Sequence, residues 1–528
     1  MSCLLFSVIN LFFIQVNAQS MYDPEFGNDG VYVQGNINFG GTDNIAFQGS
    51  DKILLGSYFQ IGFDSNYSIS RINLDGTLDA NFANNGVYTN SLSPSYNFLG
   101  SMVVDDDGSI YIVSSADINS DGKYHMTITK LTQNGVLDIT FGTDGYATLS
   151  LPTGGEVTEG LDIKTTSNGD IIVGGLMPLT DGGESIIVAK YSSNGTLDAN
   201  FGSGGSYIHP PTSSTGQRFH GILINSDDSI NIIGGLVNLT NYNENATVLK
   251  LTPNGIIDAN FGANGSYTDN YTDGSRGATR GTLLDDESIL LYGIQREDGT
   301  NNYQGWSSRI NSAGSLDTTY GTAGYGDSFY GGADIVVNYS QMIPKGNYYV
   351  LIGDIFDLVP FTRNIIITRL HSNGTFDTTY GNNGTSLFNP TSNNIISTRG
   401  RNAISRGGDF YIASEIETST LNTSSIVKLV DESLSINESV IDNNKILLYP
   451  NPVNNTTLLQ YTSMEVKTGI LSIVNVSGQQ LKTRNIDIEP GVNNFELVQD
   501  LEVLSNGVYF IHIISDGAKT ESIKFIKQ

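Results

Sequence analysis

Close copies of the stretch GTLDANFGSGGSY (residues 195–207) recur along most of this sequence, and their spacing is the strongest indication of its fold. Its aspartate returns at steps of 59 or 60 residues, an aromatic residue follows three positions later, and a glycine comes four positions after that. The aspartates are Asp79, Asp138, Asp198, Asp258, Asp317 and Asp377, and the aromatics are Phe82, Phe141, Phe201, Phe261, Tyr320 and Tyr380. A repeat at a fixed period predicts an array of similar structural units.

Each unit also carries a strand pattern. In GSMVVDDDGSIYIVSS (100–115) and LDIKTTSNGDIIVGG (161–175), two apolar segments flank an Asp-Gly or Asn-Gly pair, which is a strong hairpin signal. HMTITKL (125–131) is typical of a third strand, and GSYIHPP (205–211) of a short fourth one. Three or four antiparallel strands at a period near 60 residues predict an all-β fold. A β-propeller accommodates that period better than a β-solenoid does.

The ends of the repeat region predict how the array closes. Residues 22–30 (YDPEFGNDG) are a lone copy of the phrase, with Asp23 and Phe26 in register. A cation stands eight residues before each internal repeat aspartate, at Arg71, Lys130, Lys190, Lys250, Arg309 and Arg369. Lys428 continues this series without an aspartate after it, so we expect the first phrase to complete the last unit and close a seven-unit ring. Whether each cation pairs with its aspartate or both face solvent stays open.

The GxLDxxFGxxG phrase at this step resembles the delta-60 repeat of secreted and surface proteins, from residue 22 to about 430. The resemblance implies a β-propeller-like fold and assigns no chemistry. We interpret the recurrent aspartates and aromatics as structural, the aromatics as packing contacts and the glycines as turn residues with positive φ.

The N-terminus is typical of a secretory signal. Residues 4–16 form a short apolar run followed by small residues, which predicts a signal peptide over 1–19. The single cysteine, Cys3, lies inside it, so the mature chain has no thiol and no disulfide. The repeats then predict a propeller over 20–430, a polar linker over 431–445 and a small β-sandwich over 446–528.

The last segment resembles the type A sorting domain of the type IX secretion system of the Bacteroidota. The resemblance is carried by YPNP (449–452), VSGQ (476–479), NGVYFI (506–511) and the lysine-bearing tail. Its motif residues in this chain are Tyr449, Pro450, Asn451, Pro452, Gly478 and Gly507. It implies that the secretion machinery is a partner and that the protein is released or attached at the outer-membrane surface.

Composition excludes some classes of function. The net charge is −28, so the chain would repel phosphate backbones, and nucleic-acid binding is not expected. No later segment is typical of a transmembrane helix, and no catalytic or cofactor motif occurs.

Asp117, Asn119 and Asp121 resemble the first ligands of a calcium loop, but Ile128 stands where the bidentate carboxylate belongs, which favours a plain polar turn. We therefore expect no catalytic residue, no cofactor and no metal.

Function in repeat folds lies where the units differ. The aromatic and polar loops at 58–67, 236–245 and 296–306 are candidates, because exposed Tyr and Trp beside Asn and Gln suit sugars or peptides. The first hypothesis is a non-catalytic binding or adhesion module for glycan or protein. A glycan-degrading enzyme with carboxylates on one propeller face, and a structural surface or matrix component, are the alternatives.

Overall fold

The computed structural model describes residues 20–35, 41–61, 64–90, 92–93, 97–118, 123–149, 158–178, 184–210, 215–300, 303–328, 334–358, 361–388, 395–418, 422–431, 446–449, 453, 457–463, 466–475, 479–489, 491–501, 504–515, 518–519 and 522–527. The chain divides into two compact units, Met1–Ser435 and Ile436–Gln528. The predicted signal peptide lies outside the described residues, and so does nearly all of the predicted linker.

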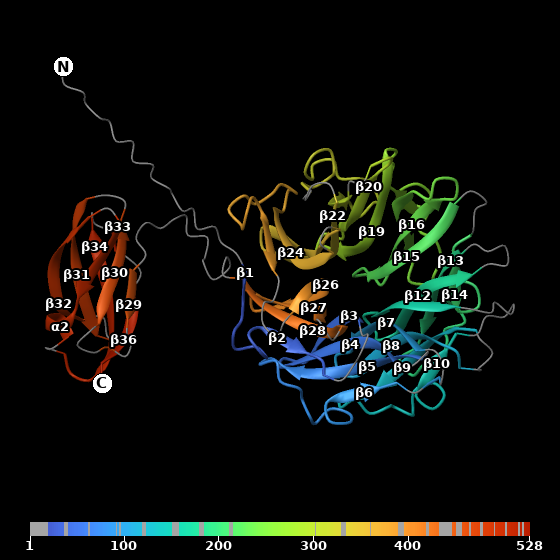
Figure 1. The fold of residues 1–528 in the computed structure, drawn as a ribbon, viewed down its shortest axis with the longest axis horizontal. Helices are drawn as coiled ribbons and strands as arrows, with labels where there is room; N and C mark the ends of the chain where they lie inside the picture. The colour runs from blue at the N-terminus through green and yellow to red at the C-terminus, as the bar shows by residue number, and fades with distance from the viewer. Residues whose placement is uncertain are drawn as a thin grey trace, which may run out of the picture. The chain divides into compact units, whose positions relative to one another are not determined.

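The described strands of the first unit form seven antiparallel sets arranged around a common centre (Figure 1). The first three sets are β3 (Gly41–Gln48), β4 (Lys52–Ile61), β5 (Asp64–Asn73) and β6 (Val87–Thr89); β7 (Asn97–Val104), β8 (Ile110–Ala116), β9 (His125–Leu131) and β10 (Tyr146–Thr148); and β11 (Glu159–Thr165), β12 (Ile171–Pro178), β13 (Glu184–Tyr191) and β14 (Ser206–Ile208). In each set the first strand is the innermost, and the chain moves outward strand by strand.

The next sets repeat this plan. They are β15 (Thr215–Ile224), β16 (Ile230–Asn238), β17 (Glu244–Leu251) and β18 (Ser266–Thr268); β19 (Gly274–Leu283), β20 (Ile289–Glu297) and β21 (Tyr303–Ile310); and β22 (Ile335–Lys345), β23 (Tyr348–Asp357), β24 (Thr362–His371) and β25 (Thr385–Phe388). A single parallel bridge between Asn245 and Arg276 joins the fourth and fifth sets into one seven-stranded sheet.

The last set is assembled from both ends of the repeat region. It contains β26 (Ile395–Arg406), β27 (Asp409–Thr418) and β28 (Asn422–Asp431), and its outer strands are β1 (Ser20–Tyr22) and β2 (Val31–Val33), which both pair with β28. Phe26 is buried in a hydrophobic cluster with Ile45 of the first set and Tyr411 of the last. The first phrase therefore completes the last unit, and the all-β propeller prediction is confirmed.

Apolar layers between neighbouring sets hold the propeller together. β8 is buried along its whole length, as expected for a continuous apolar strand covered on both faces. Separate clusters of buried side chains join each set to the next, and the aromatic of each phrase is part of one of them. Burial of this apolar surface is the main stabilising contribution.

The repeated phrase itself joins neighbouring sets. Gly142 has φ 54° and donates its backbone N–H to the carbonyl of Asn194 in the next set at 2.8 Å. A side chain at this position would place its Cβ 2.1 Å from the Tyr146 carbonyl oxygen. Gly202 makes the same bond to Asn254, and Gly262 to Ala313. The phrase recurs because every set needs this turn to reach its neighbour.

The second unit is a small sandwich of two sheets. One sheet contains β29 (Ile446–Tyr449), β30 (Leu458–Ser463) and β33 (Gly491–Glu496). The other contains β31 (Lys467–Asn475), β32 (Gln480–Ile488), β34 (Gly507–Ser515), β35 (Ala518–Lys519) and β36 (Ile523–Lys527), and α2 (Val498–Leu501) is a single helical turn. Leu459 of the first sheet and Ile473 and Ile511 of the second share one buried core.

Candidate functional site

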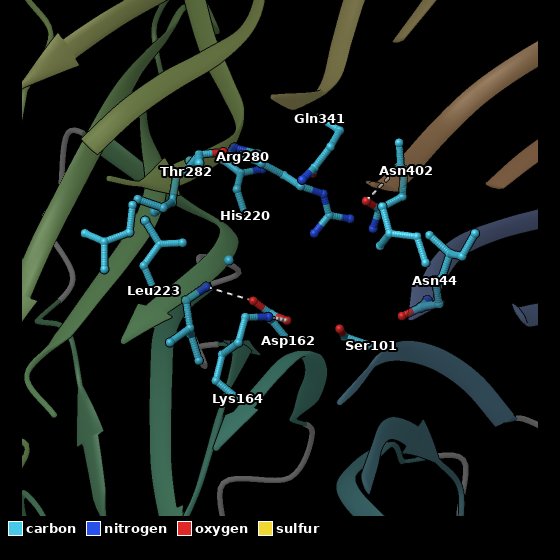
Figure 2. Close-up of a pocket in the computed structure, with 18 of the residues that line it drawn as sticks. Asn44, Ser101, Asp162, Lys164, His220, Leu223, Arg280, Thr282, Gln341 and Asn402 are labelled. Carbon is cyan, nitrogen blue, oxygen red and sulfur yellow. Dashed lines mark hydrogen bonds and ion pairs between the residues drawn. The ribbon is translucent and has the colours of Figure 1, made fainter. Parts of the chain in front are cut away.

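A pocket of about 320 Å³ lies at the centre of the propeller, and we call it the axial pocket (Figure 2). Innermost strands of all seven sets line it: β3, β7, β11, β15, β19, β22 and β26. Its volume is in the range of ordinary small-ligand sites. Because each strand comes from a different repeat, the pocket is composed by the whole ring.

A β-bulge in each innermost strand sets which side chain faces this pocket. In every set, the pairing between the first and second strands shifts by one or more residues. Such a shift changes the direction of the side chain that follows it. The first paired residues after the bulge all line the axial pocket, and they are Asn44, Ser101, Asp162, Gly221, Arg280, Gln341 and Asn402. Six of these equivalent positions thus carry polar side chains, which differ in size and charge, and Gly221 leaves the seventh without one.

Asp162 is the carboxylate that lines the pocket, and its oxygens are already engaged. The residue is 3% exposed. Its Oδ1 accepts hydrogen bonds from the Ile163 N–H at 2.9 Å and Lys164 Nζ at 2.8 Å, and its Oδ2 accepts one from the Ile222 N–H at 2.8 Å. Burial acts to raise the pKa of Asp162, but the charges and hydrogen bonds of Lys164, with Arg280 and the Ile222 N–H, leave that pKa below its usual value. Asp162 therefore stays ionised at neutral pH.

Arg280 extends from β19 into the middle of the pocket (Figure 2). Its positive charge contributes to the lowered pKa of Asp162, yet it donates no hydrogen bond to any residue in the described part of the chain. A guanidinium has five N–H donors in a planar fork that suits carboxylate and phosphate oxygens. Arg280 is thus the group in this pocket with the most unused donor capacity.

Two other polar side chains of the pocket are also engaged, Asn44 with the neighbouring set and His220 with another strand of its own set. Asn44 donates from Nδ2 to the Gly100 carbonyl and accepts at Oδ1 from the Met102 N–H, both at 3.1 Å. His220 Nε2 lies 2.7 Å from Glu244 Oε1. These contacts hold the walls of the pocket in fixed positions.

The sequence-predicted repeat residues lie away from this pocket, in the turns that lead to the fourth strands. The seven aromatics are all buried. Five aspartates pair with the cation eight residues earlier or, for Asp23, with Lys428: the pairs are Arg71–Asp79, Lys130–Asp138, Arg309–Asp317, Arg369–Asp377 and Lys428–Asp23. Lys190 instead contacts Asp170 at 2.9 Å, and Lys250 lies over the Phe261 ring. The question left open by the sequence is answered in favour of pairing in five of the seven units.

The predicted ligand loops are only partly exposed. Tyr242 is 74% exposed, but Trp306 is 3% exposed and donates its indole N–H to the Gly277 carbonyl. The expectation of an exposed tryptophan was wrong, because Trp306 packs into the layer between the fourth and fifth sets. Sequence reasoning also missed the axial pocket. Its lining residues recur about every 60 residues, which could have pointed to the pocket. Finding them would also have required the position of the bulge in each innermost strand.

The described residues include only some of the calcium-loop candidates and some of the sorting-motif residues. Asp117 is buried, whereas Asn119 and Asp121 lie outside the described residues, as do Pro450, Asn451, Pro452 and Gly478. Tyr449 ends β29 and Gly507 begins β34. Within the described residues, no group of three or more His, Cys, Asp or Glu side chains is arranged to hold a metal ion.

Comparison with known proteins identifies parts of the chain. Residues 447–528 match the family described as secretion system C-terminal sorting domain. Residues 48–82 and 166–201 match a domain of unknown function (DUF5122) described as a beta-propeller. No curated protein has significant sequence similarity to this chain.

Solved structures resemble the chain at low identity. A protein of unknown function from Dyadobacter fermentans DSM 18053 is 9% identical with a TM-score of 0.38, over 79% of this chain and 98% of that one. The sialidase of Trypanosoma rangeli is 7% identical with a TM-score of 0.35, over 97% and 87%. These similarities do not identify an activity for this chain.

Fold and comparisons together define a β-propeller protein with a secretion signal at its C-terminal end. The chain carries a DUF5122 β-propeller domain followed by a sorting domain of the type IX secretion system, and it is therefore a secreted or cell-surface protein. None of the helices in the described part of the chain has the length and hydropathy of a membrane span.

Proposed function

We propose that this protein is an extracellular, non-catalytic binding and adhesion module whose closed seven-unit ring holds a glycan in the axial pocket. The observation that carries the proposal is that six of the seven equivalent positions present polar side chains to one pocket, and that these side chains differ in charge and hydrogen-bonding groups. Structural positions of a repeat stay alike, whereas a surface that recognises an asymmetric ligand must differ from unit to unit. Amide, hydroxyl and guanidinium groups at one site suit the hydroxyls of a sugar.

The state of Asp162 favours binding over hydrolysis at this pocket. A glycosidase needs a carboxylic acid with a raised pKa to protonate the leaving group, together with a second carboxylate. Asp162 has a lowered pKa and is engaged by Lys164 and the Ile222 N–H. The pocket therefore lacks, among the residues that line it, a group suited to that acid role.

Export follows from the two ends of the chain. In this proposal residues 1–19 direct the protein to the periplasm. The domain at 446–528 then engages the secretion machinery, which brings the propeller to the cell exterior.

The test is a glycan array probed with the secreted protein, followed by titration of the best ligand against Arg280→Ala. The variant is expected to bind about tenfold more weakly, since a hydrogen bond to a charged group contributes about 1.5–3 kcal/mol. Arg218→Ala is the matched control, because Arg218 is exposed, pairs with Glu184 and does not line the pocket. Hydrolysis of a bound polysaccharide would favour the enzyme alternative, and an array without ligands would favour the structural one.

A further inference from the structure

A second pocket of about 350 Å³ lies where the sixth, seventh and first sets meet, and we call it the rim pocket. Its walls are Tyr58 and Gln60 from β4, Arg363 from β24, Ser397 and Arg399 from β26, Glu415, Ile416 and Glu417 from β27, and Asn422 from β28. It shares no lining residue with the axial pocket. The ring closure between the last and first sets therefore creates it.

Arg363, Arg399 and Glu415 line this pocket, and Asp354 and Arg401 lie next to them without lining it. Arg363 Nη1 donates to Asp354 Oδ2, and Arg401 donates from Nε and Nη2 to Glu415 Oε1 at 3.0 and 2.8 Å. Asp354 is 2% exposed, so its charge is held inside the protein. These two pairs leave the guanidinium of Arg399 without a hydrogen-bonded carboxylate among the described residues.

Arg399 is held near both carboxylates but beyond hydrogen-bond distance. Its Nε lies 3.6 Å from Asp354 Oδ1, and its Nη1 lies 3.8 Å from Glu415 Oε2. The Nε is buried and makes no hydrogen bond within the described residues. Burial lowers the pKa of Arg399, as do the nearby Arg401 and Arg363, whereas Asp354 and Glu415 oppose this shift. Asp354 Oδ1, which faces this Nε, is likewise buried without a hydrogen bond, so Arg399 is held there by charge. No hydrogen bond within the described residues uses the Nη donors of Arg399, which leaves them available to an additional anion.

The rest of the pocket suits a sugar ring carrying that anion. Tyr58 is 36% exposed, and an aromatic face of this kind packs against the apolar face of a sugar. Gln60 and Asn422 are exposed amides that can bond hydroxyls. Glu417 is also exposed at the pocket, and its negative charge opposes part of the positive potential of the arginines.

We propose that the rim pocket is a second ligand site, which binds the carboxylate of an acidic sugar through Arg399 and Arg363. Arginine is the side chain best matched to a carboxylate, because its planar fork donates two parallel hydrogen bonds. Arg399 makes the primary contact, and Arg363, already oriented by Asp354, makes a second one. The site does not depend on the function proposed for the axial pocket.

The experiment compares D-galacturonate with D-galactose, which differ in the carboxylate, by saturation-transfer NMR on the full chain. Galacturonate is expected to bind and galactose to bind at least about tenfold more weakly. Arg399→Gln should reduce galacturonate binding by about tenfold or more, and Arg399→Lys should fall between it and the wild type. Asn422→Asp adds a negative charge at the exposed edge of the pocket without disturbing buried groups, and it should also weaken binding. If Arg399→Gln fails to fold, galacturonate binding by Asn422→Asp tests the proposal in its place.

Arg280→Gln is the matched control in the axial pocket. If galacturonate binding survives Arg399→Gln and Asn422→Asp, or if the two sugars bind equally, the proposal is overturned. If binding is lost in Arg280→Gln alone, the carboxylate lies in the axial pocket. In that case the rim site is wrong while the proposed function stands.

Discussion

Lys428 Nζ lies 2.6 Å from Asp23 Oδ2, although 405 residues separate the two along the chain. Lys428 belongs to β28, and Asp23 follows β1, which pairs with the same strand. Together with Asp409, which lies 3.1 Å from the ammonium group, Asp23 raises the pKa of Lys428 in spite of the opposing effect of burial. This pair marks the seam at which the two ends of the repeat region close the propeller.

Removing the first phrase should open this seam. A chain that begins at Gln34 lacks β1, β2 and the buried Phe26 and Val31, and it exposes the edge of β28. We expect the melting temperature to fall by about 10 °C or more, since losing even one buried aromatic costs about 3–5 kcal/mol. Calorimetry of both chains measures this, and equal melting temperatures would show that the ends do not stabilise the ring.

The ion pairs should differ in strength between repeats. Asp377 and Arg369 have side chains only 1% and 6% exposed, so Asp377→Asn should lower the free energy of unfolding by about 3 kcal/mol. Asp198→Asn is the matched control, because Lys190 contacts Asp170 instead, and it should cost less than about 0.5 kcal/mol. Urea denaturation of both variants checks the difference. Similar losses would mean that the aspartates act only through their turns.

The same pairs predict how stability depends on pH. The pKa of Asp317 is lowered by hydrogen bonds from Thr319 and by Arg309, and that of Asp377 by Thr379 and Arg369 against the effect of burial. An aspartate whose pKa is lower in the folded protein stabilises it at any pH above the pKa in the unfolded chain, which is about 3.9. This stabilisation is lost as the pH falls toward the pKa in the folded protein. The melting temperature should therefore be nearly constant from pH 7 to about 5 and fall below about pH 4. The fall should be shallower in Asp377→Asn.

The turn glycine should tolerate no side chain. Gly142→Ala combines a positive φ with a Cβ 2.1 Å from the Tyr146 carbonyl oxygen, and it should cost about 2–3 kcal/mol. Gly169 has φ 80° but open space around its Cβ position, so Gly169→Ala isolates the backbone strain at about 1 kcal/mol. Equal costs in chemical denaturation would contradict the steric explanation.

The sorting domain should decide where the protein accumulates. Deleting residues 446–528 should remove most of the protein from the medium and cell surface and leave the propeller in the periplasm. Lys527→Ala is a milder variant, because Lys527 Nζ donates to the carbonyl of Leu504 at 2.6 Å and holds the last strand against the segment after α2. Immunoblots of cell fractions measure both, and normal export of the deletion would contradict the assignment.

Much of the fold could be predicted from local sequence. The phrase encodes its own turns, because each glycine supplies a positive φ and each aromatic is apolar enough to be buried. Closure was also readable, since Asp23 lacked a preceding cation and Lys428 lacked a following aspartate. The predicted exposure of Trp306 was wrong, because the alternation of apolar and polar residues along a strand does not show which face a neighbouring set covers.

The all-β repeat, the complementary ends and the secretion domain could all be predicted from short patterns of turn and strand residues. The two pockets, in contrast, depend on how distant strands come together. Bulges in seven separate strands direct Asp162 and Arg280 toward one axis, and ring closure brings Tyr58 to Arg363 and Arg399. A one-residue change in register reverses the face of a strand, and contacts across some 300 residues arise only when the ring closes, so no local pattern could specify these sites.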